Sequence, residues 1–385
     1  MPFLFLIKRE LTLLVQKRKL ILFILLFGAS AYALLIGNLY RHQVPDPIPL
    51  VLCDEDHTAL SRSLTQYMHE ADRVDIIAST DSEKEAYSFL DSKKVEGMVI
   101  IPQDFSKKIS RHEPVSILFL TDGTNTLYQS YALSPVQNAA AQFSAEREME
   151  SAALDHVPYL PAAPIYVSFR IRENPTSGYG LFYLYGVMIT AAQLGLMISF
   201  AESLHEDLKA HFFQKGPVMK LLLAKELPLA CLSLLATTPS IAIVLGIFHL
   251  PFKGSILLFF LLYAAYAGAA LFMAALMTLF FKTEIALVQC LVFYALPAFL
   301  LAGYIWPNIA MLPLMRWISY LIPLHYIIID FRNLALTGTS GTYLFHFLIL
   351  LGVSILGFFI TAGIIQRRIN KETHRPVNTR EIIEG

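Results

Sequence analysis

The chain has 385 residues, of which 55% are hydrophobic and only 16% are charged, whereas a soluble domain usually carries about 25% charged residues. Its 30 basic and 30 acidic side chains cancel at neutral pH. This composition excludes a disordered chain, a protein that binds nucleic acid through basic patches, and an ordinary cytosolic enzyme.

The charge is unevenly distributed along the chain. Residues 41–177 carry 20 acidic and 12 basic residues, while the rest of the chain carries 10 acidic and 18 basic residues. This division indicates that an acidic water-soluble part is joined to a basic membrane part. The three cysteines, at positions 53, 231 and 290, are too few for a disulfide framework.

Six segments are long and apolar enough to cross a membrane, since a spanning helix needs about 20 mostly apolar residues. The first of them could also be a signal peptide, because Ala29-Ser30-Ala31 resembles a cleavage site, but its apolar run continues past that point. The spans are expected at 20–37, 179–200, 227–250, 255–281, 285–305 and 343–365.

Basic residues in short loops predict the orientation, because cytoplasmic loops are enriched in lysine and arginine. Residues 1–19, the 201–226 loop and the tail at 367–385 are rich in them, whereas the opposite short loop near Pro251 has only Lys253. Both termini are therefore expected in the cytoplasm and residues 41–177 outside it. The even number of spans agrees with this orientation.

The outer part alternates short strand-like runs with helical patterns. This alternation predicts a small α/β sheet covered by helices. Strands are expected at 48–53, 74–78, 97–101 and 115–120, with helices at 57–68, 82–90 and 105–109 between them. A helical region follows to about residue 156, and prolines between 158 and 175 indicate a linker back to the membrane.

Two further segments have an unusual composition. The 201–226 loop mixes charged residues with apolar ones, which is equally typical of a helix along the membrane surface and of a helix that enters a groove on a partner.

Residues 306–342 contain three prolines and scattered charges among apolar residues. They are expected to form one or two short helices that enter the outer leaflet without crossing it.

Motifs for catalysis and nucleotide binding are absent from the sequence. It has no Gly-Lys pair for a phosphate-binding loop, no G-x-G-x-x-G, and no His-Glu pair with a second histidine at the zinc-binding spacing. The acidic stretch Asp54-Glu55-Asp56-His57 is interpreted as a turn and helix cap rather than a metal site. We expect no catalytic residue, no metal site and no cofactor bound by this chain.

Several motifs are informative through their order and spacing. They include Lys8-Arg9-Glu10-Leu11 and Lys17-Arg18, the segments 54–62 and 97–105, Thr121-Asp122-Gly123-Thr124-Asn125, the loop 208–225, Gly303-Tyr304-Ile305-Trp306-Pro307, and the segment 317–326 with Arg332 and Gly338. In this order they resemble the ABC-2 type membrane permeases of bacterial multidrug-efflux exporters, whose ATPase is a separate chain. The resemblance covers essentially the whole length.

One segment departs from the family pattern. The family loop usually reads E-x-E-x-G-T-L, and here Glu202 matches the first glutamate while Leu204 replaces the second. Glu206 and Asp207 stand where glycine and threonine are expected. Because that segment normally contacts the ATPase, the resemblance does not indicate how strongly this chain couples to the ATPase. The departure fits a chain that forms one half of a heterodimer.

The resemblance implies a fold and a domain organisation. The fold is an α-helical membrane protein with six transmembrane helices and an inserted α/β extracytoplasmic domain. The expected parts are a cytoplasmic interface helix at 1–19, transmembrane helix 1 at 20–40, the outer domain at 41–177, transmembrane helices 2–6 at 178–366 with the coupling loop 201–226 and the re-entrant segment 306–342, and the tail at 367–385.

The resemblance also implies partners and a location. The chain is expected in the bacterial inner membrane as a permease subunit that exports a hydrophobic or amphipathic cargo. Its partners would be a separate ATP-binding cassette subunit carrying ATP and magnesium, a second identical or homologous permease, and a periplasmic adaptor. The alternative is a membrane-anchored scaffold or receptor whose outer domain binds a partner without transport.

Three groups of candidate residues follow from the resemblance and from the apolar context of the polar residues. Polar residues within spans can instead tie helices together, and the outer aromatic residues can form an interfacial belt. The ATPase-coupling candidates are Glu202, Glu206, Asp207, Leu208, Phe212, Phe213, Pro217 and Lys225; the pathway candidates are Gln193, Gln289, Tyr294 and Tyr304; the outer-gate candidates are Trp306, Trp317, Tyr326 and Arg332.

Overall fold

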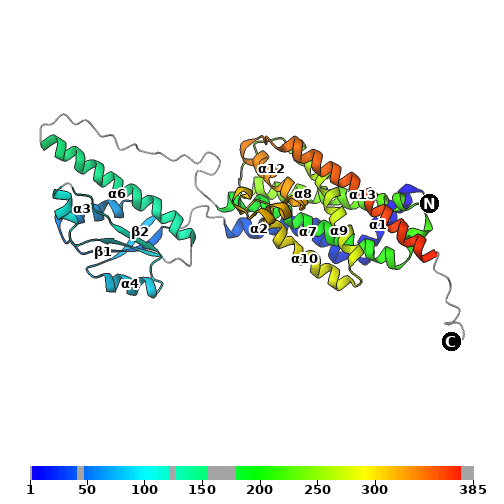
Figure 1. Cartoon of the computed structure of the whole chain (residues 1–385), viewed down its shortest axis with the longest axis horizontal. Helices are drawn as coiled ribbons and strands as arrows, with labels where there is room; N and C mark the ends of the chain where they lie inside the picture. Colours follow the sequence, from blue (N-terminus) through cyan, green and yellow to red (C-terminus); the bar gives the residue numbers. More distant parts are fainter. Residues whose placement is uncertain (1, 41–46, 112, 122–125, 155–178, 374–385) are drawn as a thin grey trace. The chain divides into compact units, whose positions relative to one another are not determined.

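The computed structural model describes residues 2–40, 47–111, 113–121, 126–154 and 179–373 (Figure 1). Its contacts divide the chain into two compact units, a helical unit of residues 1–43 and 171–385 and an inserted unit of residues 44–170. Positions 122–125 of the Asp-Gly-Thr-Asn motif, the proline-containing linker and the tail beyond residue 373 lie outside the described residues.

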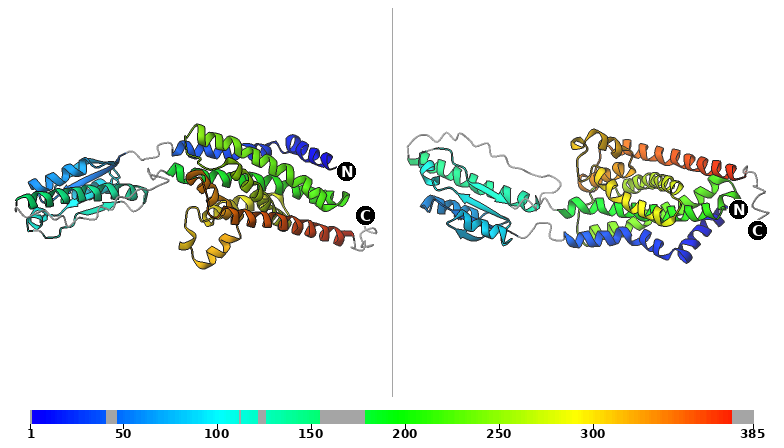
Figure 2. Two further views of the ribbon diagram at one scale, coloured as in Figure 1. Left: turned by 90° about the horizontal axis from the view of Figure 1, so that it is seen from above. Right: turned by 60° about the horizontal axis from the view of Figure 1, so that its bottom comes forward.

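The helical unit contains six helices that are long and apolar enough to cross a membrane, which confirms the predicted fold class. These helices run alongside one another (Figures 1 and 2), and α7 contacts four of the other five. It is also the most buried of the six. The six are α2 (Lys19–Leu39), α7 (Tyr179–Lys209), α8 (Val218–Gly246), α9 (Ile256–Phe280), α10 (Glu284–Leu301) and α13 (Tyr343–Thr373).

The segment expected as a long loop at 201–226 is mostly helical. Helix α7 continues to Lys209, and α8 already begins at Val218, so that only a short connection with the 3-10 helix η1 (Phe212–Lys215) separates them. The prediction of a separate amphipathic helix is therefore wrong. The helix continues because the acidic residues near its end, Glu206 and Asp207, have cationic partners within the helical unit.

Short helices occupy the two ends of the helical unit. Helix α1 (Phe3–Lys17) precedes α2, and Arg18 separates the two with non-helical backbone angles. Helices α11 (Pro313–Tyr320) and α12 (Pro323–Thr337) lie at the opposite end of the unit (Figure 2). A proline opens each of these two helices, as is common at the first helical position.

The inserted unit is a four-stranded sheet in the order β2-β1-β3-β4. Strands β1 (Ile48–Asp54), β2 (Val74–Thr80) and β3 (Gly97–Ile101) are parallel, and β4 (Leu118–Thr121) is antiparallel to β3. Helix α4 (Glu83–Asp91) covers one face, and α3 (Ala59–His69) and α6 (Thr126–Leu154) cover the other (Figure 1). The predicted α/β class of the insert is confirmed. A parallel sheet with both faces covered explains why β1 is buried almost throughout.

Small residues allow α9 and α13 to approach closely. A Cβ atom added at Gly357 of α13 would overlap a ring carbon of Phe272 on α9, and one added at Gly268 of α9 would overlap the Ser354 hydroxyl of α13. Gly268 of α9 therefore serves packing within one chain at this contact. Such close approach is how spanning helices gain packing energy in the absence of a hydrophobic driving force.

We predict that Gly357→Ala destabilises the helical unit by about 1–3 kcal/mol, because overpacking a tight contact forces its neighbours to move. Gly352→Ala on the same helix is the matched control, since an added Cβ there meets no atom within 4 Å. Thermal unfolding of the purified protein in detergent measures both. Equal melting temperatures for the two variants would contradict the close α9–α13 contact.

Candidate functional site

Charged side chains gather inside the end of the helical unit that α1, the last turns of α7 and the first turns of α8 build. Buried charges are tolerated only when they are paired and hydrogen-bonded. The group contains three cationic and three anionic residues, which together we call the ion-pair cluster: Arg9, Glu10, Arg18, Glu206, Asp207 and Lys225.

Lys225 of α8 lies at the centre of the ion-pair cluster. Its Nζ atom is 2.8 Å from Oε2 of Glu10 on α1 and 2.7 Å from Oδ2 of Asp207 on α7. It also donates hydrogen bonds to Ser203, whose hydroxyl in turn donates to Glu10. All three charged side chains are no more than 3% exposed. One ammonium group thus joins three helices.

Two arginines complete the cluster. Arg9 forms a two-pronged contact with Asp207, in which Nη2 donates to Oδ1 at 2.6 Å and Nη1 donates to Oδ2 at 3.1 Å. Arg18, at the junction of α1 and α2, pairs with Glu206 and lies 3.8 Å from Glu10. A planar guanidinium suits such a carboxylate contact geometrically. The arginines therefore extend the connection from α7 to the start of α2.

The surroundings of Arg9 keep it charged. Burial opposes the charge, but the hydrogen bond and the attraction of Asp207, helped by Glu10 and Glu206, outweigh burial and raise the pKa of the guanidinium. The guanidinium carbon also lies 3.7 Å from the ring centre of Phe212. A cation over an aromatic face is a favourable contact, and it fixes the connection between α7 and α8 against α1.

Sequence reasoning missed Glu10, Arg9 and Arg18 as partners of the α7 and α8 charges. A signal for Glu10 was present, because Leu6, Glu10 and Leu14 follow one another at intervals of four and share the buried face of α1. A carboxylate in the middle of an apolar stripe needs a cationic partner. The sequence does not say which cation it is, since Lys225 lies more than 200 positions away.

Phe212 and Phe213, two of the ATPase-coupling candidates, are not on the surface, where direct contact with a partner would need them. They are only 7% and 2% exposed and pack into the core of the helical unit. The reason is that η1 packs against α7, α8 and α13, which buries its aromatic side chains. Of the other coupling candidates, Glu202 and Leu208 are half-buried and Pro217 is exposed.

Two of the four pathway candidates lie together, and the other two lie elsewhere in the helical unit. The Tyr266 hydroxyl of α9 donates to Gln193 of α7, and the Tyr294 hydroxyl of α10 also interacts with Gln193, so these polar groups meet inside the bundle. Gln289 instead lies on the exposed face of α10. Tyr304 is buried against Gly186 at the end of the bundle that holds α11 and α12.

The outer-gate candidates divide in a similar way. Trp306 and Trp317 are 58% and 72% exposed. Tyr326 is half-buried and packs edge-on against two histidine rings, and the Arg332 guanidinium lies 5.0 Å from the Tyr304 ring centre. A polar network that the sequence did not indicate is found nearby. In it, the buried Asp330 accepts hydrogen bonds from Ser340, Thr342 and His346.

The acidic turn of the inserted unit uses its carboxylates for local structure. Asp54 accepts hydrogen bonds from the Asp56 backbone and the Ser61 hydroxyl, and Asp56 accepts from the backbone and hydroxyl of Ser106. Thr58 caps α3 in a reciprocal arrangement with Ser61. Across the described ranges, no group of three or more His, Cys, Asp or Glu side chains has a geometry that could hold a metal ion.

Comparisons with known proteins agree with the family resemblance. A family model described as ABC-2 family transporter protein matches residues 18–364, from the start of α2 into α13. The chain is similar to the probable multidrug ABC transporter permease YbhS of Escherichia coli strain K12, at 23% identity over 291 residues, which cover 74% of this chain and 75% of that protein. It is also similar to the probable multidrug ABC transporter permease YbhR of the same strain, at 22% identity over 263 residues, or 67% and 69% of the two chains.

We predict that Lys225→Met lowers the free energy of unfolding by about 3–5 kcal/mol, because it leaves two buried carboxylates without their shared cation. Adding Glu10→Gln to this variant removes one of those carboxylates, so the double variant should be more stable than the sum of the single effects implies. The free energies of unfolding of the unaltered protein, the two single variants and the double variant, measured in detergent, complete this double-mutant cycle.

Lys220→Met, at an exposed position of the same helix, is the control and should cost less than about 1 kcal/mol. Strictly additive effects of Lys225→Met and Glu10→Gln would show that the two side chains do not interact.

Proposed function

The chain belongs to the ABC-2 family of transporter proteins, and on this premise we propose that it is the membrane-spanning permease subunit of an ATP-driven exporter. ATP is hydrolysed by a separate ATP-binding cassette subunit, and the cargo is hydrophobic or amphipathic. The chain is a multi-pass membrane protein, and we place it in a bacterial inner membrane with both termini in the cytoplasm.

The ion-pair cluster carries this proposal. An exporter driven by a separate ATPase needs a rigid element that transmits motion from the ATPase to the spanning helices, because a ligand shifts a conformational equilibrium only through different contacts in the two states. Lys225 joins α1, α7 and α8 through buried charges. Motion applied to the connection between α7 and α8 would therefore move all three helices together.

The ATPase subunit would dock on the exposed residues next to this cluster. Phe212 and Phe213 support the connection from inside. The side chain of Glu206 is 48% exposed, and Lys215 and Pro217 are exposed in or next to the same short connection. These residues replace the phenylalanines as the proposed contact surface.

A second permease would cover the exposed face of α10. Gln289 is a polar side chain on this face, between the apolar residues Ile285 and Phe293, which are 73% and 78% exposed. A glutamine amide facing lipid lacks hydrogen-bond partners, whereas a helix of a second subunit can supply one. The proposed assembly therefore contains two permease chains, identical or homologous, and a periplasmic adaptor remains a further proposed partner.

The proposed orientation is tested by labelling single cysteines with a membrane-impermeant maleimide in intact spheroplasts. In a background without the three native cysteines, Lys84→Cys on exposed α4 should be labelled, and Lys215→Cys should be labelled only after the membrane is opened. The reverse pattern would place the inserted unit in the cytoplasm.

The proposed coupling is tested by co-purification with the ATPase subunit followed by an assay of ATP hydrolysis. We predict that Lys215→Asp weakens retention of the ATPase by roughly ten-fold, the typical scale for a reversed charge at an interface. Lys84→Asp makes the same charge change in the inserted unit, and this variant should retain the ATPase fully.

Two results would count against this proposal. Equal retention of the ATPase by both variants would exclude the connection between α7 and α8 as its docking surface. If no ATPase co-purifies with the unaltered chain even on co-expression, the alternative of a membrane-anchored scaffold or receptor becomes the better interpretation.

A further inference from the structure

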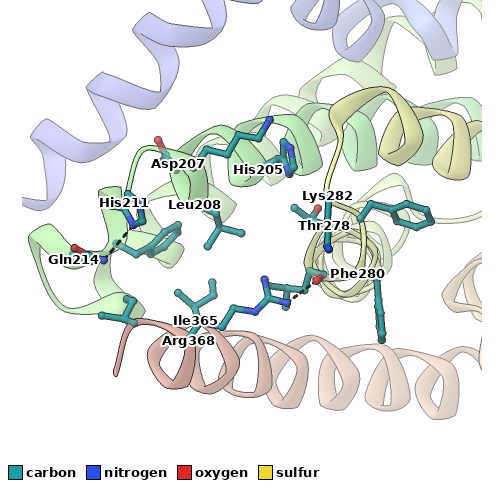
Figure 3. Close-up of a pocket in the computed structure, with 15 residues that line it drawn as sticks. His205, Asp207, Leu208, His211, Gln214, Thr278, Phe280, Lys282, Ile365 and Arg368 are labelled. Carbon is teal, nitrogen blue, oxygen red and sulfur yellow. Dashed lines mark hydrogen bonds between the residues drawn. The ribbon is translucent and has the colours of Figure 1, made fainter. Parts of the chain in front are cut away.

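A cavity of about 450 Å³ lies beside the ion-pair cluster in the helical unit (Figure 3). Its walls come from the end of α7 and the short connection with η1 that follows it, from the end of α9 and the turn to α10, and from the last turns of α13. Helix α7 ends at Lys209, α9 ends at Phe280 and α10 begins at Glu284. The cavity therefore lies where spanning helices end, which is the level of lipid headgroups.

Three cationic side chains line this cavity: Lys209, Lys282 and Arg368. In Figure 3 the amino group of Lys282 and the guanidinium group of Arg368 point into the same space. Arg368 donates one hydrogen bond, of 2.6 Å, to the backbone carbonyl of Leu279, and its guanidinium has further N–H groups that make no other hydrogen bond to the described part of the chain. Within the described residues, none of the three cations forms an ion pair.

His205 provides a second and independent sign of a ligand. It lines the cavity and is only 5% exposed, yet its Nε2 atom has no hydrogen-bond partner among the described residues. A buried polar atom without a partner costs free energy. A ligand atom in the cavity that bonds to this nitrogen would remove the cost.

The acidic groups nearby do not neutralise the cavity. Asp207 forms part of its wall, but its carboxylate is held by Lys225 and Arg9. Glu206 is held by Arg18, and Glu284, an acidic neighbour of His205, is exposed at the start of α10. An excess of positive charge thus remains in the cavity.

We propose that this cavity binds the phosphate-bearing headgroup of an anionic membrane lipid. Lysine and arginine bind phosphate oxygens through charge-assisted hydrogen bonds. The apolar wall formed by Leu208, Phe213 and Ile365 suits the glycerol end of the acyl chains, which a soluble anion lacks. Phe280, 83% exposed on the cavity wall, would lie among those chains. The binding goes beyond the permease function and does not depend on which leaflet the cavity faces.

Native mass spectrometry of the full-length protein released from detergent tests this binding, with phosphatidylglycerol as the probe and phosphatidylcholine as the zwitterionic comparison. We expect phosphatidylglycerol to bind more tightly. Lys282→Gln should weaken its binding by roughly ten-fold, the scale of one lost charge-assisted contact. Arg367→Gln is the matched control, because Arg367 is exposed, adjacent to Arg368, and outside the cavity wall.

Lys282 lies in an exposed turn, so this variant should fold, and its melting temperature should equal that of Arg367→Gln. The double variant Lys282→Gln/Arg368→Gln removes both cations, so that neither can compensate for the loss of the other. Unchanged phosphatidylglycerol binding by the double variant would overturn the proposal, as would equal binding of the two lipids. Displacement of the lipid by an equal concentration of inorganic phosphate would also overturn it, since the site would then belong to a soluble anion.

Discussion

The ammonium group of Lys225, held between the carboxylates of Glu10 and Asp207 inside an apolar helix end, constrains the rest of the helical unit. Removing charges from water is costly, and their mutual attraction compensates only when the geometry is good and further hydrogen bonds are made. Arg9 and Ser203 supply those bonds. Separating α1, α7 or α8 from the other two would expose an unpaired buried charge, so the three helices are held as one body.

Helix α7 can carry motion from this body through the rest of the bundle. It has 31 residues and is therefore about 46 Å long at 1.5 Å per residue. Asp207 lies at one end, Gln193 meets Tyr266 in the middle, and Gly186 packs against Tyr304 towards the other end. A displacement at the ion-pair cluster would thus move a polar contact inside the bundle and an aromatic contact beside α11 and α12. In the proposed permease, this is how motion at one end of α7 would reach the other end.

The amino-acid sequence predicts those features that depend on local patterns. Long apolar runs predict the six spanning helices, and the alternation of strand-like and helical patterns predicts the α/β insert. The continuation of α7 to Lys209 could not be predicted in this way, because a helix end rich in Glu and Asp resembles a solvated loop until the cationic partners of Glu206 and Asp207 are known. The burial of Phe212 and Phe213 and the pairing of Asp330 with His346 likewise depend on contacts between distant helices. The site residues themselves were suggested by family motifs, whose meaning here rests on charge partners that the motifs do not contain.

A distance measurement between α1 and the connection that follows α7 is the most direct test of the central claim. That claim is that the ion-pair cluster keeps α1 and α7 together during ATP turnover. Spin labels at Lys8→Cys and Lys215→Cys, both exposed positions, would be measured by pulsed electron resonance in the complex with the ATPase subunit, with and without a non-hydrolysable ATP analogue. A rigid body predicts the same narrow distance distribution in both states, while the distance between the two Lys215→Cys positions of a permease pair changes. A distance from position 8 to position 215 that shifts with nucleotide would show that α1 moves independently and that the cluster does not transmit the motion.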